Sequence, residues 1–322
     1  MANYGIPYMG SKDKLIHKLA FLFPAADNFY DLFGGGFSVS HFMILHHSNK
    51  YKRMFYNEIE SDTVQVIRDA ISGKYNYNVF KPQWISREDF LKNKDQCAYT
   101  RLTWSFGNNQ IGYLFGKKIE SDKRSLHQAV VFNEFNETAK KYLNIESFPK
   151  ELSIRGRRLF CRKIILERKG ELQQLERLQQ LQQLQQLQRL EQLEQLERLQ
   201  QLERLERLEQ LEFSSKSYDE VPILPNSVIY CDPPYKGTSD YLNAFNHEKF
   251  WDWVVRQSEP VFVSEYQAPK GIATLAAFRH KKLLSSVSRK DFVEKLFGNN
   301  AAVKKIRETM KQIMAPHDIK TF

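Results

Sequence analysis

The sequence predicts an α/β fold built on a doubly wound parallel sheet, and three observations indicate it. The segment "NFYDLF" (28–33) is a short apolar run that ends at a glycine cluster. The segment "KRMFYNEI" (52–59) is a second apolar run and reaches an acidic residue, Glu58. Helical patterns follow both runs, at 38–47 and at 61–73. Strands and helices therefore alternate as they do in parallel sheets.

Two later apolar runs extend the predicted sheet. They lie at 226–235 and at 259–266, the second reading "EPVFVSEY". Residues from about 85 to 165 are polar, aromatic and basic without clean alternation, which is typical of an inserted recognition lobe. The segment 301–314, "AAVKKIRETMKQIM", predicts a terminal basic helix.

Composition sets limits on the class of protein. The 322 residues suffice for a sizeable core, and no run of 18 or more apolar residues predicts a membrane span. The start of the chain lacks the layout of a signal peptide. The three cysteines, Cys97, Cys161 and Cys231, are scattered and odd in number, which argues against disulfides or a metal knuckle. We expect a cytoplasmic protein without a metal site.

The distribution of charge indicates a polyanionic partner. The formal net charge is +10, but residues 171–212 hold 9 Glu and 5 Arg. That segment carries −4, so the rest of the chain carries +14. A basic body of this size is typical of a nucleic-acid-binding protein, although a merely soluble basic surface would give the same balance.

The segment 171–212 is a leucine repeat. Leucine occupies every third position from Leu172 to Leu211, with Gln, Glu or Arg between. These residue types favour a helix, but three residues turn an α-helix by only 300°, so no lasting apolar stripe forms. A solenoid with sides three residues long would point each leucine inward. We expect a compact β-solenoid, with a helix as the alternative. The acidic balance of the segment argues against clasping DNA, so it is an accessory spacer or contact module, or else a neutral repeat expansion tolerated in a surface loop.

The segment "CDPPY" (231–235) carries the strongest chemical signal. Asp232 ends a buried strand at the edge of the sheet where ligands bind. Pro233 and Pro234 lack backbone N–H groups, so the carboxylate and nearby carbonyls form a cluster of acceptors. Such a cluster suits an exocyclic amine, and Tyr235 offers a face on which a flipped base can stack. A strand that merely ends in a proline turn is the structural alternative.

With these motifs, the chain resembles the Dam-like, DPPY-type DNA adenine methyltransferases over most of residues 1–300 apart from the repeat. "YMGSK" (8–12) is similar to the N-terminal cofactor motif of that family, and "DLFGGG" (31–36) to its glycine-rich loop. "VFVSEYQAP" (261–269) resembles its next core strand. One departure is Phe37, which stands where many relatives have glycine.

The resemblance implies a Rossmann-like methyltransferase sheet, S-adenosylmethionine as the methyl donor, and two sets of site residues. Transfer of a methyl group to the amine of a flipped adenine would involve Asp232, Pro233, Pro234 and Tyr235. The cofactor would be held by Tyr8, Lys12, Asp31, Phe33, Gly34, Gly35, Gly36, Glu58 and Asp232. Physical chemistry agrees in part, since a glycine turn permits close approach of the backbone and a strand-end acid can accept ribose hydroxyls.

The resemblance also implies a division of the chain and a DNA surface. The catalytic domain is predicted at 1–84 and 213–322, a target-recognition insert at 85–170, and the repeat insert at 171–212. Double-stranded DNA would contact cations, amides and an aromatic side chain of the insert. The predicted DNA-binding residues are Arg101, Trp104, Asn108, Asn109, Lys117, Lys118, Arg124, Arg155, Arg157 and Arg158.

Alternatives stay open at this stage. The chain could be a catalytically silent DNA-binding relative, an interaction protein acting through its repeat, or an amino-methyltransferase with another substrate. The sequence leaves open the DNA site, the oligomeric state, a cellular or phage origin, and a cognate restriction endonuclease as partner.

Overall fold

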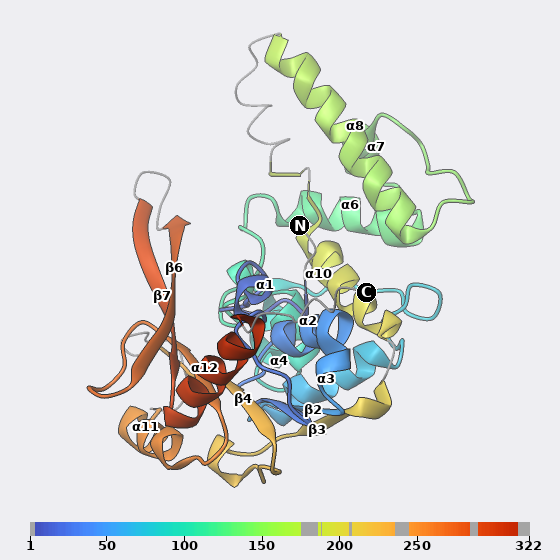
Figure 1. Ribbon diagram of the computed structural model, residues 1–322. Coiled ribbons are helices and arrows are strands. Elements are labelled where there is room, and N and C mark those ends of the chain that lie inside the picture. Colours follow the sequence, from blue (N-terminus) through green and yellow to red (C-terminus); the bar gives the residue numbers. More distant parts are fainter. Residues whose placement is uncertain are drawn as a thin grey trace, which may run out of the picture. The chain divides into compact units, whose positions relative to one another are not determined.

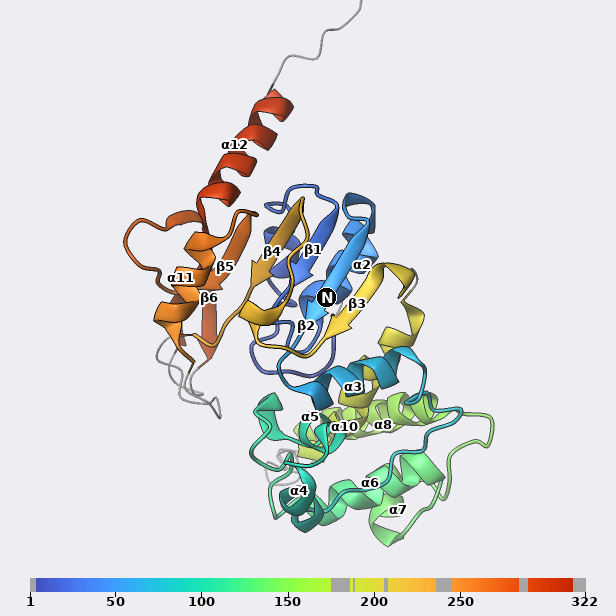
Figure 2. The same ribbon diagram turned by 90° about the horizontal axis from the view of Figure 1, so that it is seen from below.

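The computed structural model describes residues 4–174, 186–187, 189–205, 208–235, 245–283 and 289–314. The chain forms two compact units, each built from separate stretches of sequence. Unit 1 comprises residues 1–5, 11–64 and 205–322, and unit 2 comprises residues 6–10 and 65–204. Figures 1 and 2 show the elements of both units.

Unit 1 is built on a sheet with seven strands among the described residues, in the order β3-β2-β1-β4-β5-β7-β6 (Figure 2). The strands are β1 (Asn28–Asp31), β2 (Arg53–Asn57), β3 (Leu211–Ser214), β4 (Ser227–Cys231), β5 (Val261–Glu265), β6 (Ala273–Leu283) and β7 (Arg289–Gly298). Strands β3, β2, β1, β4 and β5 are parallel, whereas β7 runs antiparallel to β5 and to β6. The predicted parallel α/β sheet is therefore present.

The central strands have apolar residues in their middle and polar residues at one or both ends. All residues of β1, β4 and β5 are buried, as expected of parallel strands covered on both faces. The sequence pattern found β1, β2, β4 and β5 but missed three others. Strand β3 begins at Leu211, the last leucine of the repeat. Strands β6 and β7 pair antiparallel, and each carries several Lys and Arg residues that weaken the strand signal.

Helices of unit 1 flank this sheet. They are α1 (Ile16–Leu19), α2 (Ser38–His47), α11 (His247–Arg256) and α12 (Asn300–Met314), with 3₁₀ turns η1 (Ser48–Lys50) and η5 (Tyr218–Glu220). The helix α3 (Ser61–Ile71) runs across the boundary between the units. The predicted helices at 38–47, 61–73 and 301–314 correspond to α2, α3 and α12.

Unit 2 is helical in the described residues. Its elements are α4 (Arg87–Asn93), α5 (Ala98–Thr103), η2 (Phe106–Asn108), α6 (Glu120–Phe132), α7 (Glu137–Leu143), α8 (Ile154–Gln174), α10 (Glu191–Gln200) and η3 (Gln201–Arg204). Helices α6, α7 and α8 pack around a core that includes Leu126, Tyr142 and Ile165 (Figure 1). A second core of unit 2 is aromatic and contains Phe90 and Trp104.

The leucine repeat is helical where the structure describes it, so the β-solenoid prediction is wrong for residues 191–204. They form α10 and η3, and a further 3₁₀ turn, η4 (Leu208–Gln210), precedes β3. The alternative prediction, a helix, fits these residues. The repeat residues 175–185, 188 and 206–207 lie outside the described residues.

The mismatch between a period of three and 3.6 residues per turn is resolved in two ways. Along α10 the leucines from Leu190 to Leu199 drift by 60° a step, so together they cover about half of the helix circumference. All four are buried, because the helix packs on more than one side within unit 2. The chain then tightens into η3, in which Leu202 is buried, and Leu205 just after it is buried as well. The described leucines from Leu190 to Leu205 are therefore core residues.

Candidate functional site

Three acidic residues converge on one edge of the unit 1 sheet. Asp31 ends β1, Glu58 follows β2, and Asp232 follows β4. The order of strands reverses between β1 and β4, and ligands of open α/β sheets bind outside the carboxyl ends at such a switch point. The topology thus places all three predicted carboxylates at the position expected for a ligand site.

Asp232 is paired with Lys12 through one oxygen. The Lys12 Nζ lies 2.6 Å from Asp232 Oδ2 and 3.5 Å from Glu294 Oε1. Burial alone would lower the pKa of Lys12, but its attraction to Asp232 and Glu294 outweighs burial and raises it. Lys12 therefore stays charged and holds the two carboxylates together.

The second oxygen of Asp232 is left without a partner. Its Oδ1 is buried and has no hydrogen-bond partner among the described residues. Burial raises the pKa of Asp232 to about 6, and the opposing effect of Lys12 does not cancel this rise. An acceptor that is shielded from water and unsatisfied is costly, so this oxygen is suited to a donor supplied by a ligand.

Glu294 on β7 is a site residue that the sequence reasoning missed. It is 7% exposed and accepts a hydrogen bond of 2.8 Å from the Tyr235 hydroxyl. The Tyr235 ring also meets Tyr266 edge-on, with 4.7 Å between ring centroids, and Lys12 Nζ lies 5.1 Å from its centroid. One of two acids within the mixed-charge segment "SRKDFVEK", Glu294 gave no signal, because only strand pairing brings it to Tyr235.

The glycine loop is fixed against strand β2. Glu58 accepts hydrogen bonds from the backbone N–H of Gly35 (2.8 Å) and of Glu60 (3.2 Å). A side chain at Gly34 would place its Cβ 2.1 Å from the Tyr56 ring, so only glycine fits there. Burial raises the pKa of Glu58 to about 7. Each Glu58 oxygen accepts one of these bonds and retains a lone pair for another.

Asp31 and the residues after it complete the edge. Asp31 accepts hydrogen bonds from the Ser40 hydroxyl (2.7 Å) and backbone N–H (3.2 Å). Burial, with added repulsion from Asp232 and Glu58, raises the pKa of Asp31 to about 7. The half-buried Phe33 stacks on Tyr218, with 5.4 Å between ring centroids. Three carboxylates with raised pKa values make this edge receptive to a cationic ligand.

The surroundings of Phe37 account for its presence at a position where many relatives have glycine. Its φ is +66°, in the left-handed region that favours glycine. The ring is fully buried and packs edge-on against Tyr56, 5.1 Å between centroids. Packing of a large buried ring thus compensates for a backbone conformation that costs about 1–2 kcal/mol. Tyr8, by contrast, is half-buried in the segment Ile6–Gly10, which clusters with unit 2.

The predicted DNA-binding residues all lie in unit 2 but differ in their surroundings. Exposed positions are Lys117, Lys118, Arg124 and Arg155. Arg101 is half-buried, and its Nε donates to Gln110 Oε1 at 2.7 Å. Arg157 is half-buried, with its Nε unpaired among the described residues.

Two predicted DNA contacts need correction. Trp104 is 1% exposed and lies in the aromatic core with Phe90 and Phe115, so its ring is not available to DNA. Arg158 is 9% exposed and is held by two acids of the leucine repeat. It makes a two-pronged contact with Glu197, at 2.8 and 2.7 Å, and a third of 3.3 Å with Glu194. Its charge is satisfied inside unit 2.

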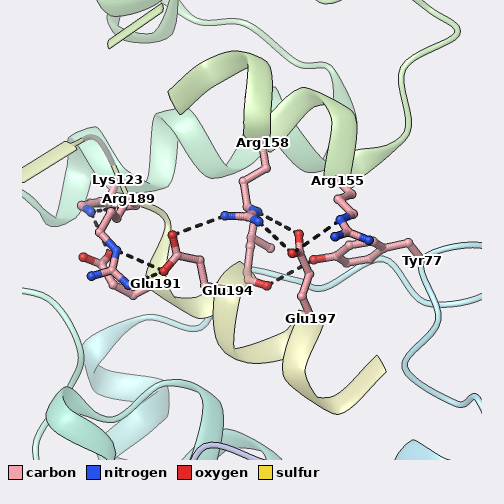
Figure 3. A network of polar contacts seen from close by, with 9 residues as sticks. Tyr77, Lys123, Arg155, Arg158, Arg189, Glu191, Glu194 and Glu197 are labelled. Atoms are coloured by element: carbon pink, nitrogen blue, oxygen red, sulfur yellow. Dashed lines mark hydrogen bonds and ion pairs between the residues drawn. The ribbon is translucent and has the colours of Figure 1, made fainter. Parts of the chain in front are cut away.

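Arg158 belongs to a network in which acids of the repeat neutralise cations of unit 2 (Figure 3). Glu191 pairs with the buried Lys123 at 2.9 Å, and Glu194 pairs with Arg189. Burial lowers the pKa of Lys123 despite its pairing with Glu191. The acidic balance of the repeat is thus used for internal pairing as well as for solubility.

Asn108 and Asn109 lie on a hairpin-like loop between the bridged residues Ser105 and Tyr113. Asn109 Oδ1 accepts hydrogen bonds from the backbone N–H of Ile111 (3.0 Å) and Gly112 (3.1 Å). Phe106, which sequence reasoning did not select, is 66% exposed on this loop. Phe106 thus shares an accessible loop with the half-buried Asn108 and Asn109.

The fold and the site define a doubly wound α/β protein with an acidic ligand site at its switch point. A comparison with protein families then identifies the family: residues 8–312 match the D12 class N6 adenine-specific DNA methyltransferase family. Because this match spans nearly the whole chain, the protein belongs to that family and is an adenine-specific DNA methyltransferase. No individual curated protein matches the chain.

Two kinds of feature are absent from the described residues. No group of three or more His, Cys, Asp or Glu side chains there is placed to hold a metal ion. No helix in the same part of the chain has both the length and the apolar character needed to cross a membrane.

Proposed function

We propose that the methyl donor is S-adenosylmethionine and that Asp232 receives the amine of an adenine flipped out of double-stranded DNA. The observation that carries this proposal is the buried Oδ1 of Asp232, which has no hydrogen-bond partner among the described residues, while Lys12 contacts both Asp232 and the Tyr235 ring. Its Oδ2 is engaged by Lys12, so the carboxylate has one fixed oxygen and one available acceptor.

The residues of the unit 1 edge fit this cofactor. S-adenosylmethionine has a net positive charge and ribose hydroxyls, and the edge offers three buried carboxylates whose pKa values are raised by burial. Glu58 would accept the hydroxyls, and the turn Gly34–Gly36 would allow close approach of the backbone. Asp31, Phe33 and Tyr8 are proposed as further contacts. When bound, the cofactor supplies an electrophilic methyl group.

Asp232 prepares the nitrogen for attack. A hydrogen bond from the amine to Oδ1 turns the nitrogen lone pair out of conjugation with the base, which makes it nucleophilic. Pro233 and Pro234 add a carbonyl acceptor without placing an N–H group nearby. The proton that the nitrogen loses has Asp232 Oδ1 as its adjacent acceptor, and a pKa of about 6 is suited to transient protonation.

Tyr235 and Glu294 position the base. The Tyr235 ring would stack on the adenine, and its hydroxyl is anchored by Glu294 at 2.8 Å. Lys12 holds Glu294 and Asp232 on a common cation, so the stacking face and the amine acceptor keep a fixed relation. We therefore propose Glu294 as a positioning residue and Lys12 as the link between the two carboxylates.

Unit 2 is proposed as the target-recognition domain. The exposed Lys117, Lys118 and Arg124 would contact phosphates, and Arg155 is 61% exposed on α8. Asn108 and Asn109 offer amides of the kind that read base edges. The exposed Phe106 would lie against bases on the same loop.

The test is nucleoside mass spectrometry of plasmid DNA incubated with the purified protein and S-adenosylmethionine. The wild type should produce N6-methyladenine, and Asp232→Ala should produce none while it retains DNA affinity within about threefold. Calorimetric titration with S-adenosylmethionine provides a readout independent of turnover. Glu58→Gln should weaken cofactor binding. Glu60→Gln is the matched control and should leave cofactor binding unchanged.

Each alternative outcome has a distinct meaning. Methylcytosine as the product would contradict the proposed base. Methylation by Asp232→Ala at the wild-type rate would remove Asp232 from the reaction. Equal cofactor affinity in the wild type and Glu58→Gln would contradict the proposed ribose contact.

A further inference from the structure

The leucine repeat contacts the loop Ser105–Tyr113 through one hydrogen bond. Gln195 of α10 donates from Nε2 to Asn108 Oδ1 at 3.1 Å. Asn108 has a φ of +59°, so its backbone holds the side chain in a turn conformation that asparagine tolerates. The bond therefore joins a residue of the repeat to a proposed base-reading residue.

The direction of this bond is determined by its surroundings. The Oε1 of Gln195 is buried without a partner in the described part of the chain. Turning the Gln195 amide over would bury an unpaired N–H group there instead, which is less tolerated than an unpaired carbonyl oxygen. Gln195 thus presents its donor, and Asn108 presents its oxygen, to the shared bond.

As a result the side-chain amides of Asn108 and Asn109 offer donors only. Asn108 Oδ1 is occupied by Gln195, and Asn109 Oδ1 is occupied by two backbone N–H groups. Neither Nδ2 makes a hydrogen bond to the described residues. Amide donors match base edges that carry acceptors, such as N7 and O6 of guanine, and not the N–H₂ edge of cytosine.

We propose that Gln195 of the leucine repeat is a specificity-determining positioning residue, which fixes the Asn108 amide so that the loop selects an acceptor-bearing base edge next to the target adenine. This inference rests on the proposed DNA-reading role of the loop. The repeat thus contributes to sequence recognition without contacting the base itself.

The packing of α10 makes it a rigid support for this task. Gln192 donates to His127 Nδ1 at 3.1 Å, and the other ring nitrogen of His127 contacts the carbonyl of Pro82 at 2.9 Å. Burial lowers the pKa of His127 to about 4, so the ring stays neutral and its Nδ1 accepts the hydrogen bond from Gln192. A hollow of about 410 Å³ is lined both by the loop residue Phe106 and by the repeat residue Glu191. Loop and repeat therefore form one surface.

The experiment maps the sites methylated in a randomised DNA library by Gln195→Glu and by the wild type. A carboxylate accepts only, so Asn108 must turn its amide over, donate to Glu, and present Oδ1 outward. We expect the preference at one position of the site to change toward a base with an N–H₂ edge. The ratio of kcat/KM for the two bases should change by about tenfold.

Two further variants control this test. Asn108→Asp should reproduce the changed preference, since one carboxylate oxygen accepts from Gln195 and the other faces outward. Gln201→Glu adds the same charge at an exposed repeat position and should keep the wild-type preference. If Gln195→Glu has a lowered melting temperature, Asn108→Asp alone decides the question.

Wild-type preference in both Gln195→Glu and Asn108→Asp would overturn the inference. So would the same altered preference in Gln201→Glu. Absence of any methylation by the wild type would instead contradict the proposed function, so the two failures are distinguishable.

Discussion

The ion pairs of the two units differ in what they leave available. In unit 1, Lys12 engages one oxygen of Asp232, and the other oxygen is buried without a partner among the described residues. In unit 2, Arg158 binds both oxygens of Glu197 and one of Glu194. Saturated pairs stabilise a fold, whereas an unsatisfied acceptor in a buried site is prepared for a ligand. In this pair, the Asp232 oxygen without a hydrogen-bond partner therefore indicates the ligand site.

The largest expected effect comes from Asp232→Asn, which replaces an acceptor by a donor at residue 232 with almost no change in shape. Lys12 can only donate, so it will hold the Asn oxygen and place the N–H₂ group where Oδ1 was. The substrate amine then meets a donor, and we expect kcat to fall by about 10³-fold. Single-turnover methylation of a duplex checks this, with melting temperature as the control. Activity within tenfold of the wild type would mean that Oδ1 is not the acceptor.

Next in size is the loss of stability from breaking the saturated pair. Arg158→Ala leaves Glu197 half-buried without its close cation, whereas Glu194 keeps Arg189, and we expect a loss of about 2–3 kcal/mol in the free energy of unfolding. Arg155→Ala is the matched control, because that side chain is 61% exposed and lies 3.9 Å from Glu197. It should cost less than about 0.5 kcal/mol. Urea denaturation of the full chain measures both, and equal losses would contradict the contrast.

A smaller effect is expected for Tyr235→Phe, which keeps the stacking ring but removes its anchor. Without the bond to Glu294 the ring is less fixed, and we predict a fall of about tenfold in kcat with little change in DNA affinity. Tyr266→Phe is the control, since its ring contact with Tyr235 is retained. A loss of DNA affinity without a change in kcat would indicate a binding role instead.

Measured over a single pH unit, the smallest effect on stability comes from the carboxylates of unit 1. The pKa of Asp31 is about 7 in the folded chain and near 3.8 in an unfolded one, so between these values the folded state binds more protons. Stability of the ligand-free protein should therefore fall as pH rises through this window, by at most about 1.4 kcal/mol per pH unit for this group. Asp31→Asn removes that contribution, and the difference between the two denaturation series isolates it. Identical pH dependence would contradict the raised pKa.

The sequence by itself determined the parallel sheet and its acidic edge. Strands such as "SVIYC" are apolar in their middle, and this local signal needs no partner to be readable. The position of Asp232 at the switch point follows from strand order, since carboxyl ends of parallel strands share an edge. The motif order of the family gave the glycine loop, Glu58 and Tyr235.

Only the tertiary structure decided the rest, because those features depend on partners distant in sequence. Glu294 reaches Tyr235 through the antiparallel strand β7, and Trp104 is buried by an aromatic core. The period of three suggested a solenoid, but helix packing on more than one side and a 3₁₀ turn bury the same leucines. Arg158 shows the same limit: a basic residue in sequence is a DNA contact or an internal ion pair according to which acids fold against it.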